Sequence, residues 1–147
     1  MLEDKEKMIK QRIKGNLIRG MAEVFEYAIK QRCDISAFTK RFLQSETFSE
    51  YFEDDTLNCQ SAGYIYDVYM DEELNGSWCD YSYGDNPDAA HWIGYLLAAW
   101  HIEDGISGVE LAEKYIVEDL KYDYPALHTQ DIFYAIDCIK EDRERAE

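Results

Sequence analysis

The segment from Asn86 to Gly105 constrains the fold most strongly, because it joins a clear helix start to a clear helix stop. Asn86 is a favourable N-cap, and Pro87 suits the first helical position. Between this start and Gly105, the stretch "HWIGYLLAAWH" (His91–His101) would be apolar on every side of a helix. Because such helices are buried, we expect a central helix over about 87–103 that other helices enclose.

The flanking segments also have helical periodicity, and none shows the sustained alternation of a strand. An N-terminal helix is predicted over Glu3–Gln31, with Ile9, Ile13 and Leu17 facing inward and Lys and Arg outward. Further helices are predicted at 34–54 (two), at 61–74, from Ser107 to the "YDYP" stop, and from Thr129. The fold class is therefore all-α, a single domain over 1–147 with about six or seven helices. It comprises a basic amphipathic helix (1–32) and an acidic helical core (36–140).

The central helix and the last helix supply the predicted core. Gly94 should allow a neighbouring helix to approach closely, and the polar atoms of the Trp and Tyr residues should find partners. The predicted structural core residues are Trp92, Gly94, Tyr95, Leu96, Trp100 and Ile136.

Charge is distributed unevenly along the chain, whose formal net charge is −16. The 72 residues from Phe42 to Glu113 include 16 Asp or Glu but no Lys or Arg. Such a field repels nucleic acid and anionic membranes, so we expect neither direct nucleic-acid binding nor membrane binding. It attracts a basic protein surface, although the same charge can also serve only to keep a protein soluble.

Acidic residues and aromatic residues mix just before the central helix, in the predicted loop Asn75–Asn86 and its flanks. Tyr and Trp are favoured anchors at protein interfaces, whereas the alternative is that these rings fold back onto the domain. The predicted partner-binding residues are Asp71, Glu72, Glu73, Trp78, Asp80, Tyr81, Tyr83, Asp85 and Asp88.

The histidines do not form a recognisable catalytic or metal site. His91 and His101 are ten residues apart, hence about 80° apart around a helix and about 15 Å along it, too far to share a metal. His128 precedes a predicted helix start, where we expect a local hydrogen bond. No catalytic motif, EF-hand register or paired cysteine spacing is present, so we expect no catalytic residues, metal or cofactor.

The four cysteines are expected to be free thiols, because none are close in sequence and no signal peptide is recognisable. No apolar run is long enough to span a membrane. The expected location is the cytoplasm.

Three segments, "FTKRFLQSETFSEYFE", "WIGYLLAAWH" and "LHTQD…AID", resemble in that order a family of small uncharacterised acidic helical proteins of Gram-positive bacteria. The resemblance spans about residues 36–140. The matching positions of its signatures are Trp92, Ile93, Gly94, Tyr95, Leu96, Trp100, His101, His128, Thr129, Asp131, Ala135, Ile136 and Asp137. Members are often encoded beside proteins similar to ADP-ribosyltransferase toxins, which implies an antidote or accessory role.

Three functions follow as hypotheses. The first is a non-enzymatic, antitoxin-like inhibitor that binds and neutralises a basic partner, either a toxin or a defence enzyme. The second is a DNA mimic that inhibits a restriction or CRISPR nuclease. The third is a small helical enzyme that uses His101 or His128.

Overall fold

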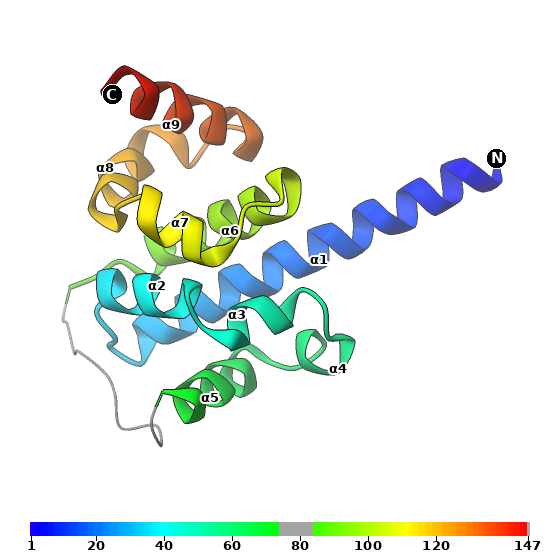
Figure 1. Cartoon of the computed structure of the whole chain (residues 1–147), viewed down its shortest axis with the longest axis horizontal. Helices are drawn as coiled ribbons and strands as arrows, with labels where there is room; N and C mark the ends of the chain where they lie inside the picture. The colour runs from blue at the N-terminus through cyan, green and yellow to red at the C-terminus, as the bar shows by residue number, and fades with distance from the viewer. Residues whose placement is uncertain (74–83, 147) are drawn as a thin grey trace.

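The computed structural model describes residues 1–73 and 84–146, and within them helices joined by short connections make up the fold, with no strand (Figure 1). The helices are α1 (Leu2–Lys30), α2 (Ile35–Leu43), α3 (Glu46–Tyr51), α4 (Asp55–Asn58), α5 (Ala62–Glu72), α6 (Pro87–Asp104), α7 (Gly108–Lys114), α8 (Val117–Leu127) and α9 (Ile132–Ala146). The all-α prediction is confirmed. The described part contains nine helices rather than six or seven, because α4 is a single turn and the segment after Ser107 divides into two.

None of the helices in the described part combines the length and the apolar character that crossing a membrane requires.

The α1–α6 pair forms the centre of the protein, and the other helices pack on either side of it (Figure 1). A Cβ atom added to Gly94 would lie 2.7–2.9 Å from Cγ, Cδ1 and Cβ of Phe25. Carbon atoms normally approach to about 3.5–4.0 Å, so this contact exists only because residue 94 has no side chain. The expectation of a close helix approach at Gly94 is confirmed.

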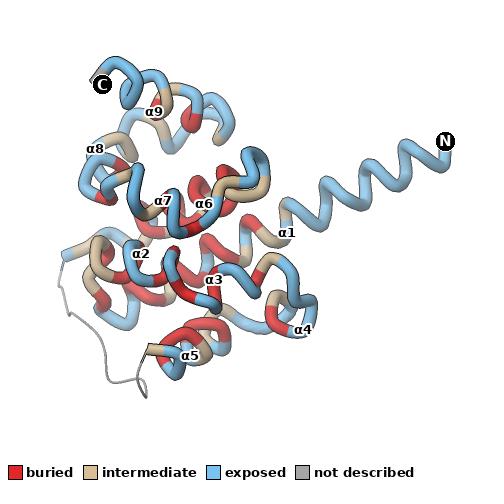
Figure 2. The backbone as a smooth tube through the Cα atoms, viewed as in Figure 1, coloured by how far each residue is buried: buried red, intermediate tan, exposed pale blue. Residues whose placement is uncertain are grey.

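The central helix α6 is enclosed, as Figure 2 shows by its buried stretches. Leu96 and Trp100 are 0% and 1% exposed, and Trp92 is 7% exposed. Gly94 and Ile136 are also buried. Tyr95 is only half-buried, because its side chain both packs against the core and lines a surface pocket.

Aromatic rings join α1, α2 and α5 on the other side of the centre. Phe38 stacks on Phe42 at 5.0 Å, and Tyr69 meets both rings edge-on at 5.7 and 5.0 Å. Phe25 of α1 approaches Phe38 edge-on at 5.3 Å. Edge-on and offset arrangements of this kind are the favourable ones for aromatic pairs, so this cluster holds α2 and α5 against α1.

The helix boundaries follow local sequence signals in several places. The side chains of Asp34, Ser45, Asn86 and Ser107 accept hydrogen bonds of 2.9–3.1 Å from first-turn amides of α2, α3, α6 and α7. Gly105 ends α6 in the left-handed conformation, at φ 66°. These caps satisfy backbone groups that a helix end leaves without partners.

The helix predicted from Ser107 to "YDYP" is wrong in its extent. Tyr115 and Ile116 are extended (φ −124°, ψ 127° and φ −94°, ψ 130°), which separates α7 from α8. The Tyr115 ring packs on Trp100 at 4.2 Å and gains an aromatic contact at this break. α8 continues through Pro125 to Leu127, although a proline at this position has no N–H to bond the carbonyl of Lys121.

The outer half of α1 projects from the body of the protein (Figure 1). Every residue from Met1 to Lys14 is exposed, and Ile18 is the first buried one. The prediction that Ile9 and Ile13 face inward is therefore wrong, since they are 55% and 54% exposed. We refer to residues 1–14 as the arm.

Replacing Gly94 by alanine should lower the free energy of unfolding by about 1–3 kcal/mol, because the added methyl group must displace Phe25. Gly15→Ala is the matched control in α1, where a Cβ would meet only the flexible Arg19 guanidinium, at 3.3 Å. Since alanine favours helix, this variant should be neutral or more stable by up to about 1 kcal/mol. Urea unfolding measures both variants, and equal effects would contradict the close α1–α6 packing.

Candidate binding pocket

A pocket of about 420 Å³ lies between the first turns of α6 and the connection from α8 to α9. Its lining residues are Asp88, His91, Trp92 and Tyr95 on α6, and Tyr124, His128, Gln130, Asp131 and Ile132 on the other side. This volume is in the range of sites that take a small molecule or a single inserted side chain.

Helical spacing explains why one wall comes from α6. Asp88, His91, Trp92 and Tyr95 are separated by three, one and three residues, so they share one face of that helix. The opposite wall contains the start of α9 and the "HTQD" segment at 128–131. The structure thus brings together two segments that are about thirty residues apart, and sequence reasoning missed this pocket.

Aromatic rings form much of the pocket wall. The Trp92 and Tyr124 rings lie 5.8 Å apart, and the Tyr124 and His128 rings 4.5 Å apart, measured between centroids. Tyr95 lines the same pocket from the next turn of α6. Faces of aromatic rings attract cations through their quadrupole, and since Trp92 is buried, the half-buried rings of Tyr95 and Tyr124 are those that a positively charged group would meet.

Two carboxylates add negative charge to the pocket. Asp88 is exposed in the first turn of α6, and Asp131 lies just before α9. Asp131 also accepts hydrogen bonds from the amides of Phe133 and Tyr134, at 3.1 and 3.2 Å. No Lys or Arg is among the described residues that line the pocket, so neither carboxylate meets a cation there.

The His128 ring is oriented by a backbone hydrogen bond. Its Nδ1 atom lies 2.8 Å from the carbonyl oxygen of Tyr124. A carbonyl can only accept, so Nδ1 carries the proton and donates it. In the neutral ring, Nε2 therefore keeps its lone pair and can accept a hydrogen bond or take up a proton.

Trp92 is an exception to the expectation that the polar atoms of buried Trp residues find partners. Its indole Nε1 is buried, and no hydrogen-bond acceptor for it exists among the described residues. The ring is instead held by packing in the α6 wall, with only 7% of the residue exposed. An unpartnered buried donor costs free energy, so residue 92 is a less than ideal core position.

His91 and His101 lie in different environments. His91 is half-buried at the pocket, whereas the His101 ring packs against Phe48 and Phe52 at 5.3 and 4.4 Å. The Nδ1 atom of His101 donates to the carbonyl oxygen of Ile106 at 2.7 Å. This donation and the aromatic contacts give His101 a structural role between α6 and α3.

The predicted partner-binding residues are divided in the structure. Trp78, Asp80, Tyr81 and Tyr83 lie outside the described residues. Asp71 and Asp88 are exposed. On the outer face of α5, Tyr64 (51% exposed) and Asp67 precede Asp71 at helical spacing, and sequence reasoning did not single out this acidic and aromatic strip.

Glu72 is engaged by the fold instead of being free for a partner. Its carboxylate accepts hydrogen bonds from the amides of Glu46 and Thr47 at 2.8 and 2.9 Å, and from Thr47 Oγ1 at 2.7 Å. These amides are at the start of α3, where a helix leaves donors without partners. Glu72 therefore caps α3 from the end of α5.

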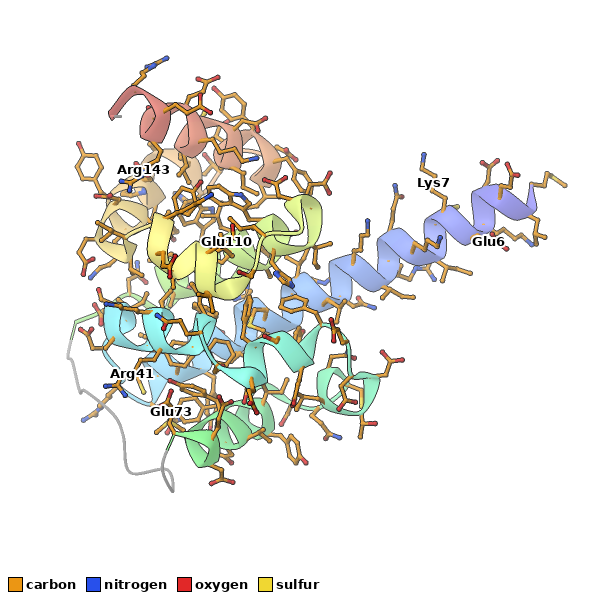
Figure 3. The ribbon with its side chains drawn as sticks, viewed as in Figure 1. Glu6, Lys7, Arg41, Glu73, Glu110 and Arg143 are labelled. Carbon is orange, nitrogen blue, oxygen red and sulfur yellow. The ribbon has the colours of Figure 1, made fainter. Side chains whose placement is uncertain are left out.

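Glu73 and Asp85 are also engaged within the chain. Glu73 lies 3.6 Å from the Arg41 guanidinium, beside which Figure 3 shows it, and it accepts a 3.3 Å hydrogen bond from Tyr69. Burial and the Glu73 charge raise the pKa of Tyr69. Asp85 accepts from the Ile35 amide and pairs with Lys121, both at 3.1 Å. These two carboxylates tie α5 and the start of α6 to α2 and α8.

Metal ligation has no candidate in residues 1–73 and 84–146, where no group of three or more His, Cys, Asp or Glu is arranged to hold an ion.

Comparisons with family models, with curated proteins and with solved structures found no match to this chain. We therefore infer function from the geometry and charge of the chain's own residues.

Replacing Glu72 by alanine should lower the free energy of unfolding by about 1–2 kcal/mol, because the Glu46 and Thr47 amides at the start of α3 lose their acceptor, although Ser45 still caps the Phe48 amide. Asp71→Ala removes the same charge from the neighbouring exposed position and should change stability by less than about 0.5 kcal/mol. Thermal unfolding followed by circular dichroism compares the two variants. Equal stability of both would show that Glu72 does not cap α3.

Proposed function

We propose that this chain is a non-enzymatic, antitoxin-like inhibitor that binds a basic partner protein and takes a Lys or Arg side chain of that partner into the pocket between α6 and α9. The observation that carries the proposal is the combination of an aromatic wall with two carboxylates, in a pocket without Lys or Arg. A cation in this pocket would interact with both aromatic rings and carboxylates.

The energetics suit an anchor side chain. A cation over an aromatic face contributes about 0.5–2 kcal/mol, more when water is excluded. A charge-assisted hydrogen bond to Asp88 or Asp131 adds to this, and the planar guanidinium of Arg can use both interactions together. The formal net charge of −16 accelerates the encounter with a basic surface.

The partner we propose is a toxin or a defence enzyme with a basic substrate cleft. This part of the proposal is supported by the family resemblance, whose members are often encoded beside ADP-ribosyltransferase-like proteins. An acidic protein that inserts into a basic cleft blocks substrate entry without any catalysis. Co-expression with the product of the adjacent gene tests it, because an inhibitor should co-purify with that product and abolish its toxicity.

One observation favours an enzymatic alternative at the same pocket. The hydrogen bond from His128 Nδ1 to Tyr124 leaves Nε2 as a base in the neutral ring, beside a cavity that could hold a substrate. His128→Gln would abolish such a reaction but reduce partner binding only moderately. Loss of activity together with full inhibition of the partner would separate the two roles.

Titration of the full chain with N-acetyl-arginine amide should shift the NMR signals of the His91, His128 and Trp92 side chains. The expected dissociation constant is on the order of millimolar, because a single side chain supplies little contact. N-acetyl-citrulline amide has the same shape without the charge and should bind at least about five-fold more weakly if cation recognition dominates.

Two variants with the same change of charge control this titration. Asp88→Asn removes a carboxylate at the pocket and should weaken arginine-amide binding, whereas Asp71→Asn lies away from it and should not. Equal binding of the arginine and citrulline compounds would count against cation recognition. An unchanged affinity in Asp88→Asn would remove that residue from the site.

A further inference from the structure

The arm leaves an apolar stripe without any contact from its own chain. Leu2, Ile9 and Ile13 are 73%, 55% and 54% exposed, and their spacing places them on one side of α1. Packing of an apolar face supplies most of the stability of a helix in a protein, and this face of the arm has no such packing. The stripe therefore points to a partner that covers it.

Charge on the arm indicates what kind of surface that is. Lys5, Lys7, Lys10, Arg12 and Lys14 outnumber Glu3, Asp4 and Glu6, so the arm is net positive while the whole chain is −16. Two parallel arms would bring like charges together, and two antiparallel arms would still combine two net positive segments. The complementary surface is the acidic body of another copy.

A groove between α8 and α9 has the matching properties. It has a volume of about 280 Å³ and includes Ile116, Leu120, Tyr122 and Ile139 among its lining residues. Ile116 is 53% exposed and Tyr122 is 85% exposed, so apolar surface is open to solvent there. This groove shares no lining residue with the pocket between α6 and α9.

The groove carries a cluster of carboxylates. Asp119, Asp123 and Asp142 line it, and among the described residues none of the three forms an ion pair with Lys or Arg. Burial and the neighbouring charges of Asp142 and Asp119 raise the pKa of Asp123. A cation placed against this cluster would relieve that repulsion.

Lys114 and Arg143 also line the groove, on the side where it meets a second pocket that they share. The groove therefore has an acidic part and a basic part. The arm has the opposite pattern, with Glu3, Asp4 and Glu6 at its start and Lys10, Arg12 and Lys14 further along.

We propose that the arm of one copy docks in the α8–α9 groove of a second copy, and that two copies exchange arms to form a closed dimer. The arm and the groove of a single chain lie toward opposite ends of the molecule, as the positions of Lys7 and Arg143 in Figure 3 show. An arm therefore cannot fold back into its own groove. In a two-fold arrangement each arm reaches the groove of the other copy, and no groove or arm remains open.

Charge reversal on each side tests the dimer, with the full chain and sedimentation velocity at low salt. The unchanged chain should dimerise in a concentration-dependent way and dissociate as salt rises, because the exposed charges are screened. Lys10→Glu/Lys14→Glu reverses the arm, and Asp119→Lys/Asp142→Lys reverses the groove. All four substituted positions are exposed, so both variants should fold. Circular dichroism checks this.

Each variant alone should be monomeric, and an equimolar mixture should form a heterodimer. In the mixture the reversed arm meets the reversed groove, and the native arm meets the native groove. Lys30→Glu/Lys40→Glu is the matched control for the arm variant. It makes the same change in net charge at exposed positions away from the arm, and it should still dimerise.

A chain that stays monomeric at every concentration at low salt would overturn the proposal. The proposal would also be overturned if the arm variant were monomeric while the groove variant still dimerised, because the arm would then contact another arm or a different surface. Failure of the mixed variants to associate would exclude exchange between arm and groove.

Discussion

The contact between Phe25 and Gly94 is the one on which the rest of the structure depends. It lets α1 lie directly against α6, and the two helices together form the centre on which α2, α5, α7, α8 and α9 pack. With that face of α6 against α1, the face that carries Asp88, His91 and Tyr95 turns toward α8 and α9. The pocket therefore follows from how α6 is buried, because the α6 face that forms its wall is the one not packed against α1.

Sequence could predict those parts of the fold that local signals determine. The Asn86–Pro87 start and the Gly105 stop of α6 depend on backbone chemistry within a few residues, and both were predicted. The break at Tyr115 depends on packing against Trp100, which no local pattern reveals. The stripe of Ile9 and Ile13 predicted a helix face but could not show whether the chain itself covers that face, and it does not.

The candidate site was harder to predict, for a physical reason. The segment from Phe42 to Glu113 contains no Lys or Arg, so its carboxylates can pair only with backbone or hydroxyl donors or with cations outside the segment. Glu72 uses backbone amides of α3, while Glu73 and Asp85 use Arg41 and Lys121, which flank the segment. An acidic run therefore contains both structural and free carboxylates, and only tertiary structure separates them. His128 and Asp131 of "HTQD" likewise become candidate site residues only in the tertiary structure, where they face α6 across the pocket.

The uneven charge distribution acquires a structural meaning as well. Because the outer half of α1 is one continuous helix, it holds its positive charges away from the acidic body of the same chain. The attraction between these two regions cannot be satisfied within one molecule, so it is available for association between molecules. Since the α8–α9 groove and the pocket share no residue, a dimer joined through the arms would leave both pockets open. Such a dimer would present two cation-binding pockets to a basic partner, which raises the effective affinity if the partner offers two sites at a matching distance.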